Sequence, residues 1–535
     1  MGEVVTVLVA GHSAPPRLPP VSQQPALFRR LGEVVMAITS GLDGAAGLRL
    51  LTGVAAGTDR VAAELAQAQQ LPLHLLAPGN PEPLSPSQAA AERIVWLGAS
   101  DIQHQAGEPL DVRDHVALAF ADMVLVVWDG DVPPGHVGRT VRLVLQAAQH
   151  LKPVLWLNTA GEVRWLDRTR LTLATLNLLR SPHPESGLLR GLFSAALPIS
   201  ALPAAVNQEI ATMLPRNTPA VPLSADHPAL GQVMEARMAY SGKLADRAGK
   251  MHRRFIWISY LASAFAVFAA VAGAIGLWPG GHNNFWAFVE LTLIAGIIAG
   301  VILARSRDWH GQWIRQRFIA EQLRCAKLAI PMLCIPEHFT KPMWVASKGG
   351  LELLSNEHLI LHRTLIQEGL PHGPDTKTFL PNSIEVQSQH IAVLRATVAD
   401  QFDYHTHKHH KTHVQHERLH KLSLGLFVLT FVAVLLHFVI HANWLLICTA
   451  FFPALAAALH GLSAKLEIGR IAGQSHATAA ALAALSVAID GVAVDSSWDG
   501  WLRIRELTLA AAQLMSTENA QWQALISHQQ AELPA

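Results

Sequence analysis

Glycine, hydroxyl and carboxylate residues occur together in one short segment that leads into a helical pattern. The segment from Leu51 to Glu64 reads LTGVAAGTDRVAAE, and Gly53 and Gly57 precede a helical pattern that begins near Thr58. Glycine lets the backbone approach a ligand closely, and a helix N-terminus presents N–H groups and the positive end of its dipole. The pattern therefore predicts an anion as the ligand; the alternative is that Thr58 or Asp59 simply caps the helix.

Two further loops have the same character. One follows the first apolar run, at AGHS, and the other is the segment WDGDVPPGHVGRT, where glycines precede Arg139 and Thr140. The loops should meet if the apolar runs before them are neighbouring parallel strands. The candidate ligand-binding residues are Gly11, His12, Gly53, Gly57, Thr58, Asp59, Asp129, Gly135, Gly138, Arg139 and Thr140.

The elements that must position these loops alternate between strands and helices. Near-continuous apolar runs predict strands at 4–12, 48–53, 71–78, 123–130 and 152–158. Helical spacing predicts helices at 28–42, from residue 58, and at 86–97, 111–122 and 137–151. This order predicts an α/β, Rossmann-like parallel sheet covered on both faces, with ligands outside the carboxyl ends of its strands.

The second half of the chain contains four long apolar spans. Each is long enough, at about 1.5 Å per residue, to cross a hydrocarbon core of roughly 30 Å. We therefore expect a multi-pass, all-α transmembrane domain with four membrane helices in two hairpins. The spans are 255–278, 285–304, 422–441 and 443–462.

Basic residues set the orientation of both hairpins. The short turns at 279–284 and 441–443 contain no Lys or Arg. By the positive-inside rule, the opposite ends and both chain termini are cytoplasmic. The basic residues at those ends are Arg253, Arg254, Arg305, Arg307, Arg418, Lys421, Lys465 and Arg470.

Few polar groups lie within the spans, and two of them are candidates to line a pore. Glu290 either snorkels toward the nearby outer turn or faces an aqueous path between subunits, and His437 is the second candidate. Four helices are few for a pore within one chain. A pore would therefore require a homo-oligomer in contact with membrane lipids.

Composition excludes several other classes of protein. Lys plus Arg (41) nearly equals Asp plus Glu (40), so we expect no nucleic-acid partner. The three cysteines, Cys325, Cys334 and Cys448, have no metal-ligand spacing, and we expect no metal and no cofactor. No Ser/His/Asp ordering, HExxH or complete Walker loop is present, so no catalytic residue is assigned.

The order TGVAAGTDRVAAE, RDHVALAFADMVLVVWDG, PGHVGRTVRLV and KPVLWLN, over residues 4 to 160, resembles the SLOG superfamily of Rossmann-like nucleotide-sensing domains. The LOG phosphoribohydrolases of that group carry PGGxGTxxE at the second loop. Here Val141, Arg142 and Leu143 occupy the region of the catalytic glutamate. Because glycosidic cleavage needs a carboxylate, this departure favours sensing, although Asp59, Asp114 or Asp129 could substitute.

The two hairpins, each followed by a cytosolic helix, resemble the SLATT group of two-helix membrane effectors. RFIAEQ (317–322) and GRIAGQ (469–474) indicate an internal repeat. Together, the two resemblances imply an effector of bacterial anti-phage defence in the inner membrane. It would sense a nucleotide-derived second messenger made by an enzyme encoded elsewhere and oligomerise to permeabilise that membrane. The alternatives are a membrane-anchored nucleotide or NAD-derivative hydrolase and a constitutive ion transporter.

Histidines are concentrated before the second hairpin, in the segment from 400 to 422. His409, His413, His416 and His420 recur on one face of a helix. This face would pack or meet anionic headgroups at the membrane boundary; the alternatives are metal binding and proton sensing.

The expected domain order follows from these segments. It is a ligand-sensing domain at 1–205, a linker and cytosolic helix at 206–250, a first transmembrane hairpin with exit helix at 251–330, cytosolic helices and loops at 331–420, a second hairpin with exit helix at 421–515 and a C-terminal tail at 516–535.

Overall fold

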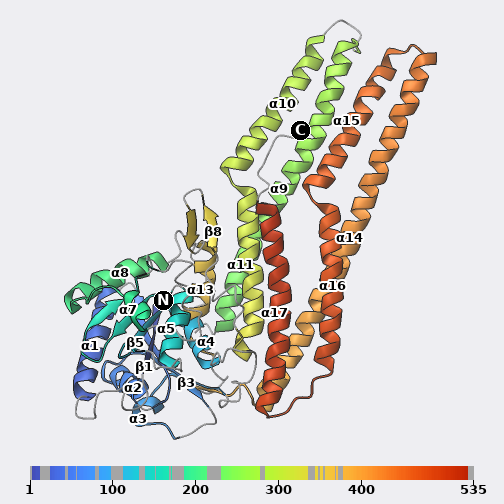
Figure 1. Cartoon of the computed structure of the whole chain (residues 1–535). Helices are drawn as coiled ribbons and strands as arrows, with labels where there is room; N and C mark the ends of the chain where they lie inside the picture. Colours follow the sequence, from blue (N-terminus) through green and yellow to red (C-terminus); the bar gives the residue numbers. More distant parts are fainter. Residues whose placement is uncertain are drawn as a thin grey trace. The chain divides into compact units, whose positions relative to one another are not determined.

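The computed structural model shows two compact units, each assembled from separated stretches of the chain (Figure 1). The first unit comprises Met1–Ala236, Leu323–Ala392 and Val492–Ala512, and the second comprises Arg237–Gln322, Val393–Gly491 and Gln513–Ala535. The structure describes residues 3–11, 24–42, 46–55, 57–78, 83–97, 112–131, 139–150, 152–167, 170, 186–213, 230–277, 283–334, 344–347, 350–353, 356–367, 369–371 and 377–527.

The first unit is built on an eight-stranded sheet in the order β10-β4-β3-β2-β1-β5-β6-β7, in which only the β6–β7 pair is antiparallel. This confirms the expected α/β sheet. Its strands are β1 (Glu3–Gly11), β2 (Ala46–Thr52), β3 (Leu73–Pro78), β4 (Arg93–Leu97), β5 (Met123–Val127), β6 (Val154–Leu157), β7 (Val163–Trp165) and β10 (Thr378–Phe379); a separate hairpin pairs β8 (Trp344–Ser347) with β9 (Gly350–Leu353).

Helices cover both faces of this sheet, which explains why its strands are apolar throughout. Val5, Val7 and Val9 of β1 belong to a core cluster that includes residues of α1, α2 and α8, whereas the alternating Leu8 is buried on the opposite face. The helices of this unit are α1 (Gln24–Gly41), α2 (Thr58–Ala68), α3 (Pro86–Ala89), α4 (Val112–Ala119), α5 (Arg139–Gln149), α7 (Ser186–Gly191), α8 (Leu202–Met213) and α13 (Asn356–Gln367).

The strand order places a topological switch point between β1 and β5. From β1 the chain builds outward through β2, β3 and β4, and then returns to add β5 on the other side. In doubly wound sheets, ligands bind outside the carboxyl ends of the strands at such a point.

One sequence-based prediction was wrong: residues 86–97 are not a single helix. The segment forms the one-turn helix α3, which begins at a capping box on Ser85, and then the buried strand β4, Arg93–Leu97. The apolar run RIVWL is too short to distinguish a buried strand from a helix by periodicity. Its pairing with β3 decides the outcome.

The eighth strand comes from between the two membrane hairpins and could not be predicted from local pattern. Thr378 and Phe379 form β10, which pairs in parallel with β4. Helix α13 from the same region contacts β1. Arg49 donates to the carbonyls of Ile366 and Gln367, at the end of α13. The segment that connects the hairpins is therefore part of the sheet unit.

A buried polar cluster fixes α13 to the sheet. Arg363 donates to Oδ1 of Asp122 at 2.6 Å and to the carbonyl of Val4 at 2.9 Å. Oδ2 of Asp122 accepts from the backbone N–H of Thr6. Lys152 donates to the carbonyl of Ala121 at 2.6 Å, and its Nζ lies 3.1 Å from Nε2 of His362. Arg363 and Asp122 are both almost fully buried.

We predict that Arg363→Met destabilises the first unit strongly, because it leaves the carboxylate of Asp122 buried without its cation. The expected loss is about 3–5 kcal/mol, or roughly 6–20 °C in apparent melting temperature. The control is Arg395→Met, which breaks an exposed ion pair with Asp490 and should change little. Equal melting temperatures for the two variants would contradict the prediction.

We predict that the buried Lys152 makes the stability of the folded protein depend on pH. Burial lowers the pKa of Lys152 to about 7 from 10.5, while the charge of Asp122 opposes the shift. Between these values the unfolded chain binds a proton that the folded chain does not, so stability rises with pH through this window. In Lys152→Met, the rise in apparent melting temperature with pH should be smaller. Identical pH profiles for the two proteins would rule this out.

The second unit consists of long helices that form the two hairpins. Phe265 and Phe268 of α9 both contact Phe451 of α15, so the hairpins lie side by side (Figure 1). Its helices, some of which extend into the first unit, are α9 (Leu230–Ala274), α10 (Asn283–Ser306), α11 (Trp309–Ala329), α14 (Ile384–Val439), α15 (Asn443–Lys465), α16 (Ile468–Asp490) and α17 (Trp498–Ser527).

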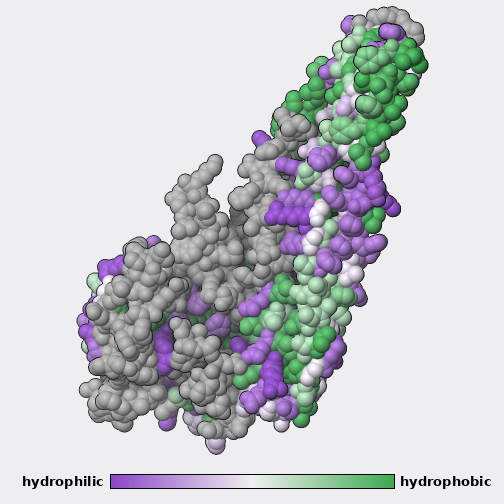
Figure 2. Space-filling model, turned by 45° about the vertical axis from the view of Figure 1, so that its right-hand side comes forward, coloured by the Kyte–Doolittle hydropathy of each residue, from purple (hydrophilic) through white to green (hydrophobic). Residues whose placement is uncertain are grey.

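Four of these helical segments are long and apolar enough to cross a membrane, which confirms the expected number. Near the two hairpin turns, these segments expose large apolar side chains, among them Phe288 at 67% and Phe438 at 77% (Figure 2). Exposing so much apolar surface is unfavourable in water and favourable in the hydrocarbon core of a membrane. The chain is therefore a membrane protein with an α/β domain.

Each hairpin has one helix that is broken at a residue with a positive φ, and this shared feature supports the internal repeat. Asp308 (φ 44) separates α10 from α11, and Glu467 (φ 48) separates α15 from α16. Both are acidic residues in the left-handed conformation, which is strained for any residue with a side chain. In each hairpin one helix, α9 or α14, is continuous and the other is broken. The repeat therefore aligns residue 308 with 467, and not 317 with 469 as the sequence match indicates.

Candidate functional site

The first glycine loop is held together from within by a buried carboxylate. Oδ2 of Asp59 accepts from the backbone N–H of Ala55 at 3.2 Å, and the Thr52 hydroxyl lies 3.3 Å from Oδ1 and 2.8 Å from the carbonyl of Val9. A Cβ atom on Gly53 would collide with Oδ2 of Asp59. Gly53 is therefore required because Asp59 occupies the space that a side chain would fill.

Arg113, at the start of α4, completes this loop, and sequence reasoning did not identify it. Its Nη1 would lie 3.0 Å from a Cβ on Gly53, and its Nε lies 3.8 Å from Oδ1 of Asp114. Arg113 is only 12% exposed. An arginine this deeply set beside a glycine loop is suited to bind a phosphate. The sequence feature that could have identified Arg113 is its position in the first turn of a predicted helix, directly before Asp114.

The surroundings of Asp59 shift the pKa of its carboxyl group. Burial raises the pKa of Asp59, whereas Arg113 and the hydrogen bonds from Ala55, Thr52 and Gly53 act in the opposite direction. The burial effect is the larger one. Asp59 is thus a loop-positioning group whose carboxylate points into the protein.

Helix α2 begins without a side-chain cap. Its N-cap is Gly57, with φ 92 and ψ −127, and no side chain hydrogen-bonds there. This backbone conformation favours glycine. The alternative interpretation, in which Thr58 or Asp59 simply caps the helix, is therefore not what the structure shows. An uncapped helix N-terminus retains the electrostatic preference for an anion.

Gly11, at the end of β1, lies where the start of α2 and the end of β5 meet. A Cβ at Gly11 would approach the hydroxyl of Thr58 and the carbonyl oxygen of Val127, each to 2.5 Å. Hence the end of β1, the start of α2 and the end of β5 are in close contact at the switch point. The predicted convergence of Gly11, Gly53, Thr58 and Asp59 is what the structure contains.

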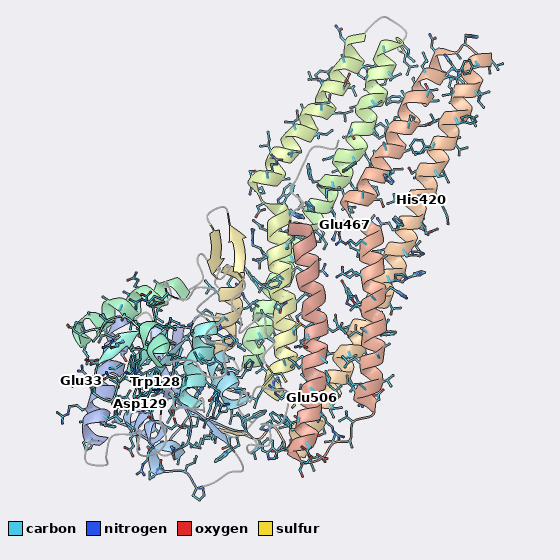
Figure 3. The ribbon with its side chains drawn as sticks, viewed as in Figure 1. Glu33, Trp128, Asp129, His420, Glu467 and Glu506 are labelled. Carbon is cyan, nitrogen blue, oxygen red and sulfur yellow. The ribbon has the colours of Figure 1, made fainter. Side chains whose placement is uncertain are left out.

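The loop after β5 has its own supports. Trp156 donates to the carbonyl of Trp128 at 2.7 Å, and Arg190 donates to the carbonyl of Gly130 at 2.9 Å and to Oδ1 of Asp131. Asp129 follows the buried Trp128 directly (Figure 3). Its carboxylate accepts from the backbone N–H of Asp131. Arg190, which sequence reasoning also missed, therefore holds the two residues that follow Asp129.

Several other predicted residues lie elsewhere or outside the described part of the chain. Thr140 is buried in the first turn of α5, and His12, Gly135, Gly138 and the side chain of Arg139 lie outside the described residues. Of the pore candidates, Glu290 is partly exposed on α10. The ring of His437, on α14, lies 6.3 Å from that of His441.

The histidine-rich face packs against neighbouring helices. His409 donates to the carbonyl of Ala472 at 2.8 Å and its ring stacks on that of His413. Nδ1 of His416 lies 3.3 Å from the hydroxyl of Ser463. Within the described ranges, no three His, Cys, Asp or Glu side chains are grouped so that they could hold a metal ion.

Comparisons with protein-family models, with curated proteins and with solved structures returned no match.

We predict that Gly53→Ala loosens the loop, because the new methyl group must displace Asp59. A loss of roughly 1–3 kcal/mol is expected, read as a lower melting temperature and faster amide exchange in α2. Gly187→Ala is the matched control, since nothing lies within 4 Å of its Cβ position. If both variants are equally stable, Asp59 does not constrain position 53.

Proposed function

We propose that this chain is a membrane effector that senses a nucleotide-derived anion through its α/β domain and, on binding, assembles into an oligomer that permeabilises the bacterial inner membrane. The SLOG and SLATT resemblances favour a role in anti-phage defence, with a signal made by a separate enzyme. The observation that carries the proposal is the joining of an anion-suited loop at a switch point to four membrane helices in one chain.

The ligand class follows from the loop. Arg113 supplies a deeply set positive charge, and the uncapped start of α2 supplies N–H groups next to Gly11 and Gly53. Phosphate groups match both features. A cyclic oligonucleotide or an ADP-ribose derivative carries such groups.

Sensing is favoured over hydrolysis because the available carboxylates have structural tasks. Asp59 accepts hydrogen bonds from its own loop, and Asp129 accepts one from Asp131. Asp114 lies beside the Arg113 guanidinium. A catalytic acid must instead reach the substrate.

The connection between the hairpins gives the ligand a route to the membrane helices. Helix α13 and strand β10 lie in the chain between α11 and α14, yet both belong to the sheet unit. A ligand that favours one arrangement of this unit thereby acts on the ends of both hairpins. The size of that effect is limited by how much more tightly the ligand binds the favoured arrangement than the arrangement without ligand.

A membrane-anchored hydrolase is the second candidate. One observation favours it: burial raises the pKa of Asp59, which is the shift that a general acid requires. Four membrane helices exceed what an anchor needs.

One paired measurement separates the two functions. The purified full-length protein is reconstituted in dye-loaded liposomes and incubated with cyclic di- and trinucleotides and with ADP-ribose derivatives. We expect dye release with the nucleotide recovered intact. Nucleotide cleavage without dye release would establish the hydrolase instead.

Variants connect dye release to the loop. Arg113→Gln removes the positive charge, and Gly57→Asp places bulk and negative charge at the helix start in a conformation that favours glycine. Arg113→Gln should weaken nucleotide binding roughly 10–100-fold, the equivalent of one charge-assisted contact. Gly57→Asp should abolish release. Arg395→Met, far along the chain on α14, is the control, and unchanged release by both loop variants would show that the loop is not the sensor.

A further inference from the structure

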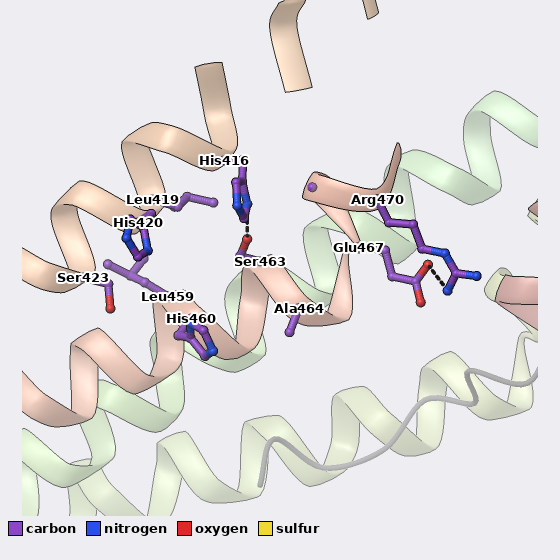
Figure 4. A pocket seen from close by; sticks show the side chains of 11 residues that line it. His416, Leu419, His420, Ser423, Leu459, His460, Ser463, Ala464, Glu467 and Arg470 are labelled. Carbon is purple, nitrogen blue, oxygen red and sulfur yellow. Dashed lines mark hydrogen bonds and ion pairs between the residues drawn. The ribbon is translucent and has the colours of Figure 1, made fainter. Parts of the chain in front are cut away.

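The break between α15 and α16 forms one side of a polar pocket that none of the functions above uses. The cavity measures about 330 Å³ and lies between α14, α15 and the first turn of α16. Three imidazoles, two hydroxyls and the Arg470–Glu467 ion pair line it together with apolar side chains of α14 and α15 (Figure 4). The lining residues are His416, Leu419, His420, Ser423, Leu459, His460, Ser463, Ala464, Glu467, Gly469 and Arg470.

The pocket is located where the spans meet the cytosol. Residues 422 and 462 are the cytosolic limits of the second pair of apolar spans, and the lining residues lie on both sides of these limits. On α14 the next turns expose Leu424 at 58%, Phe427 at 51% and Val428 at 55%. A molecule in the pocket would therefore have a polar environment at one end and an apolar helix surface directly beside it.

The polar groups of the pocket retain capacity for a ligand. His416 uses Nδ1 toward the Ser463 hydroxyl, and among the described residues neither His420 nor His460 makes a hydrogen bond. Oε2 of Glu467 lies 3.6 Å from Nη1 of Arg470, which offsets its negative charge. The pocket thus offers several N–H and O–H donors, and its acid is already paired with a cation.

The first hairpin provides an internal comparison, because the equivalent break there is filled. Two residues after Asp308, His310 contacts His252 with 3.1 Å between ring nitrogens, and Trp313 packs against both rings. Two residues after Glu467 stands Gly469, whose Cβ position would lie 3.3 Å from the ring of His416. Glycine in place of a second ring leaves the space open. The two breaks therefore differ in what stands beside the left-handed residue, a histidine in the first hairpin and a glycine next to the cavity in the second.

We propose that this pocket binds the phosphate group of an anionic phospholipid of the cytoplasmic leaflet. Imidazole, hydroxyl and guanidinium donors surround the phosphate, and the acyl chains lie along the exposed apolar turns of α14. A free phosphate would satisfy the same donors but would not use the apolar surface. Lipid bound at this break holds α15 and α16 in one relative orientation at the hinge of the second hairpin.

The test compares lipid retention by single-residue variants of the full-length protein. Purified protein in neutral detergent is mixed with phosphatidylglycerol, and bound lipid is counted by native mass spectrometry. His420→Glu introduces a negative charge into the lining at an exposed position, so folding should be unaffected. We expect its retention of phosphatidylglycerol to fall roughly tenfold or more, as for loss of a charge-assisted contact.

The matched control is His410→Glu, which makes the same change at an exposed position on the same helix but outside the lining. It should retain lipid as the unmodified protein does. Gly469→Val is a second variant that reduces the cavity through His416 and should also lower retention. Equal retention by the His420 and His410 variants would overturn the proposal.

A competition arm distinguishes the two sources of phosphate. If lipid occupies the pocket, excess inorganic phosphate should displace little phosphatidylglycerol, because it lacks the acyl contacts. Complete displacement by inorganic phosphate would show that the pocket binds a soluble anion, and the lipid assignment would fail.

Discussion

The buried ion pair between Arg363 and Asp122 is the interaction on which the organisation of the first unit depends. It connects α13, which lies in the chain between the two hairpins, to the start of β5 and, through Thr6, to β1. A single charge could not remain at this depth without its partner. The candidate ligand loops follow the carboxyl ends of β1 and β5, whereas the contacts of Arg363 with Asp122 and Val4 lie at the amino ends of the same strands. One pair of strands therefore carries both the candidate ligand loops and the contacts that hold α13.

The two hairpins of the second unit have the same helix break but differ in the residues that surround it. Each hairpin pairs a continuous helix with one that is broken at a left-handed acidic residue, Asp308 or Glu467. A conformation that is costly for a side chain persists only where its surroundings impose it. At the first break, rings from His252, His310 and Trp313 supply those surroundings. At the second break, Gly469 stands beside a cavity, in which a bound ligand can contribute to the conformation of this hairpin.

The candidate ligand loop shows how a carboxylate can be misread from sequence. Asp59 follows a glycine loop and starts a helix, which is typical of a cap or a ligand contact. It is instead turned inward, where it binds the loop backbone beside Arg113. The glycine at position 53 is explained by that inward turn as much as by any ligand. Arg113 arrives from α4, about fifty residues later in the chain, and so no local pattern joins it to the loop.

The sequence by itself determined the alternation of strands and helices and the four membrane spans, because burial on two faces and burial in lipid both require long apolar runs that composition displays directly. It also determined that Gly11, Gly53 and Thr58 converge, since parallel strands share an edge. Tertiary structure alone decided that RIVWL is strand β4, that Thr378 and Phe379 extend the sheet, and that Arg113 and Arg363 meet their acids. Those outcomes depend on partners distant in the chain, and the energy of a pairing or a buried charge exists only once both partners are in place.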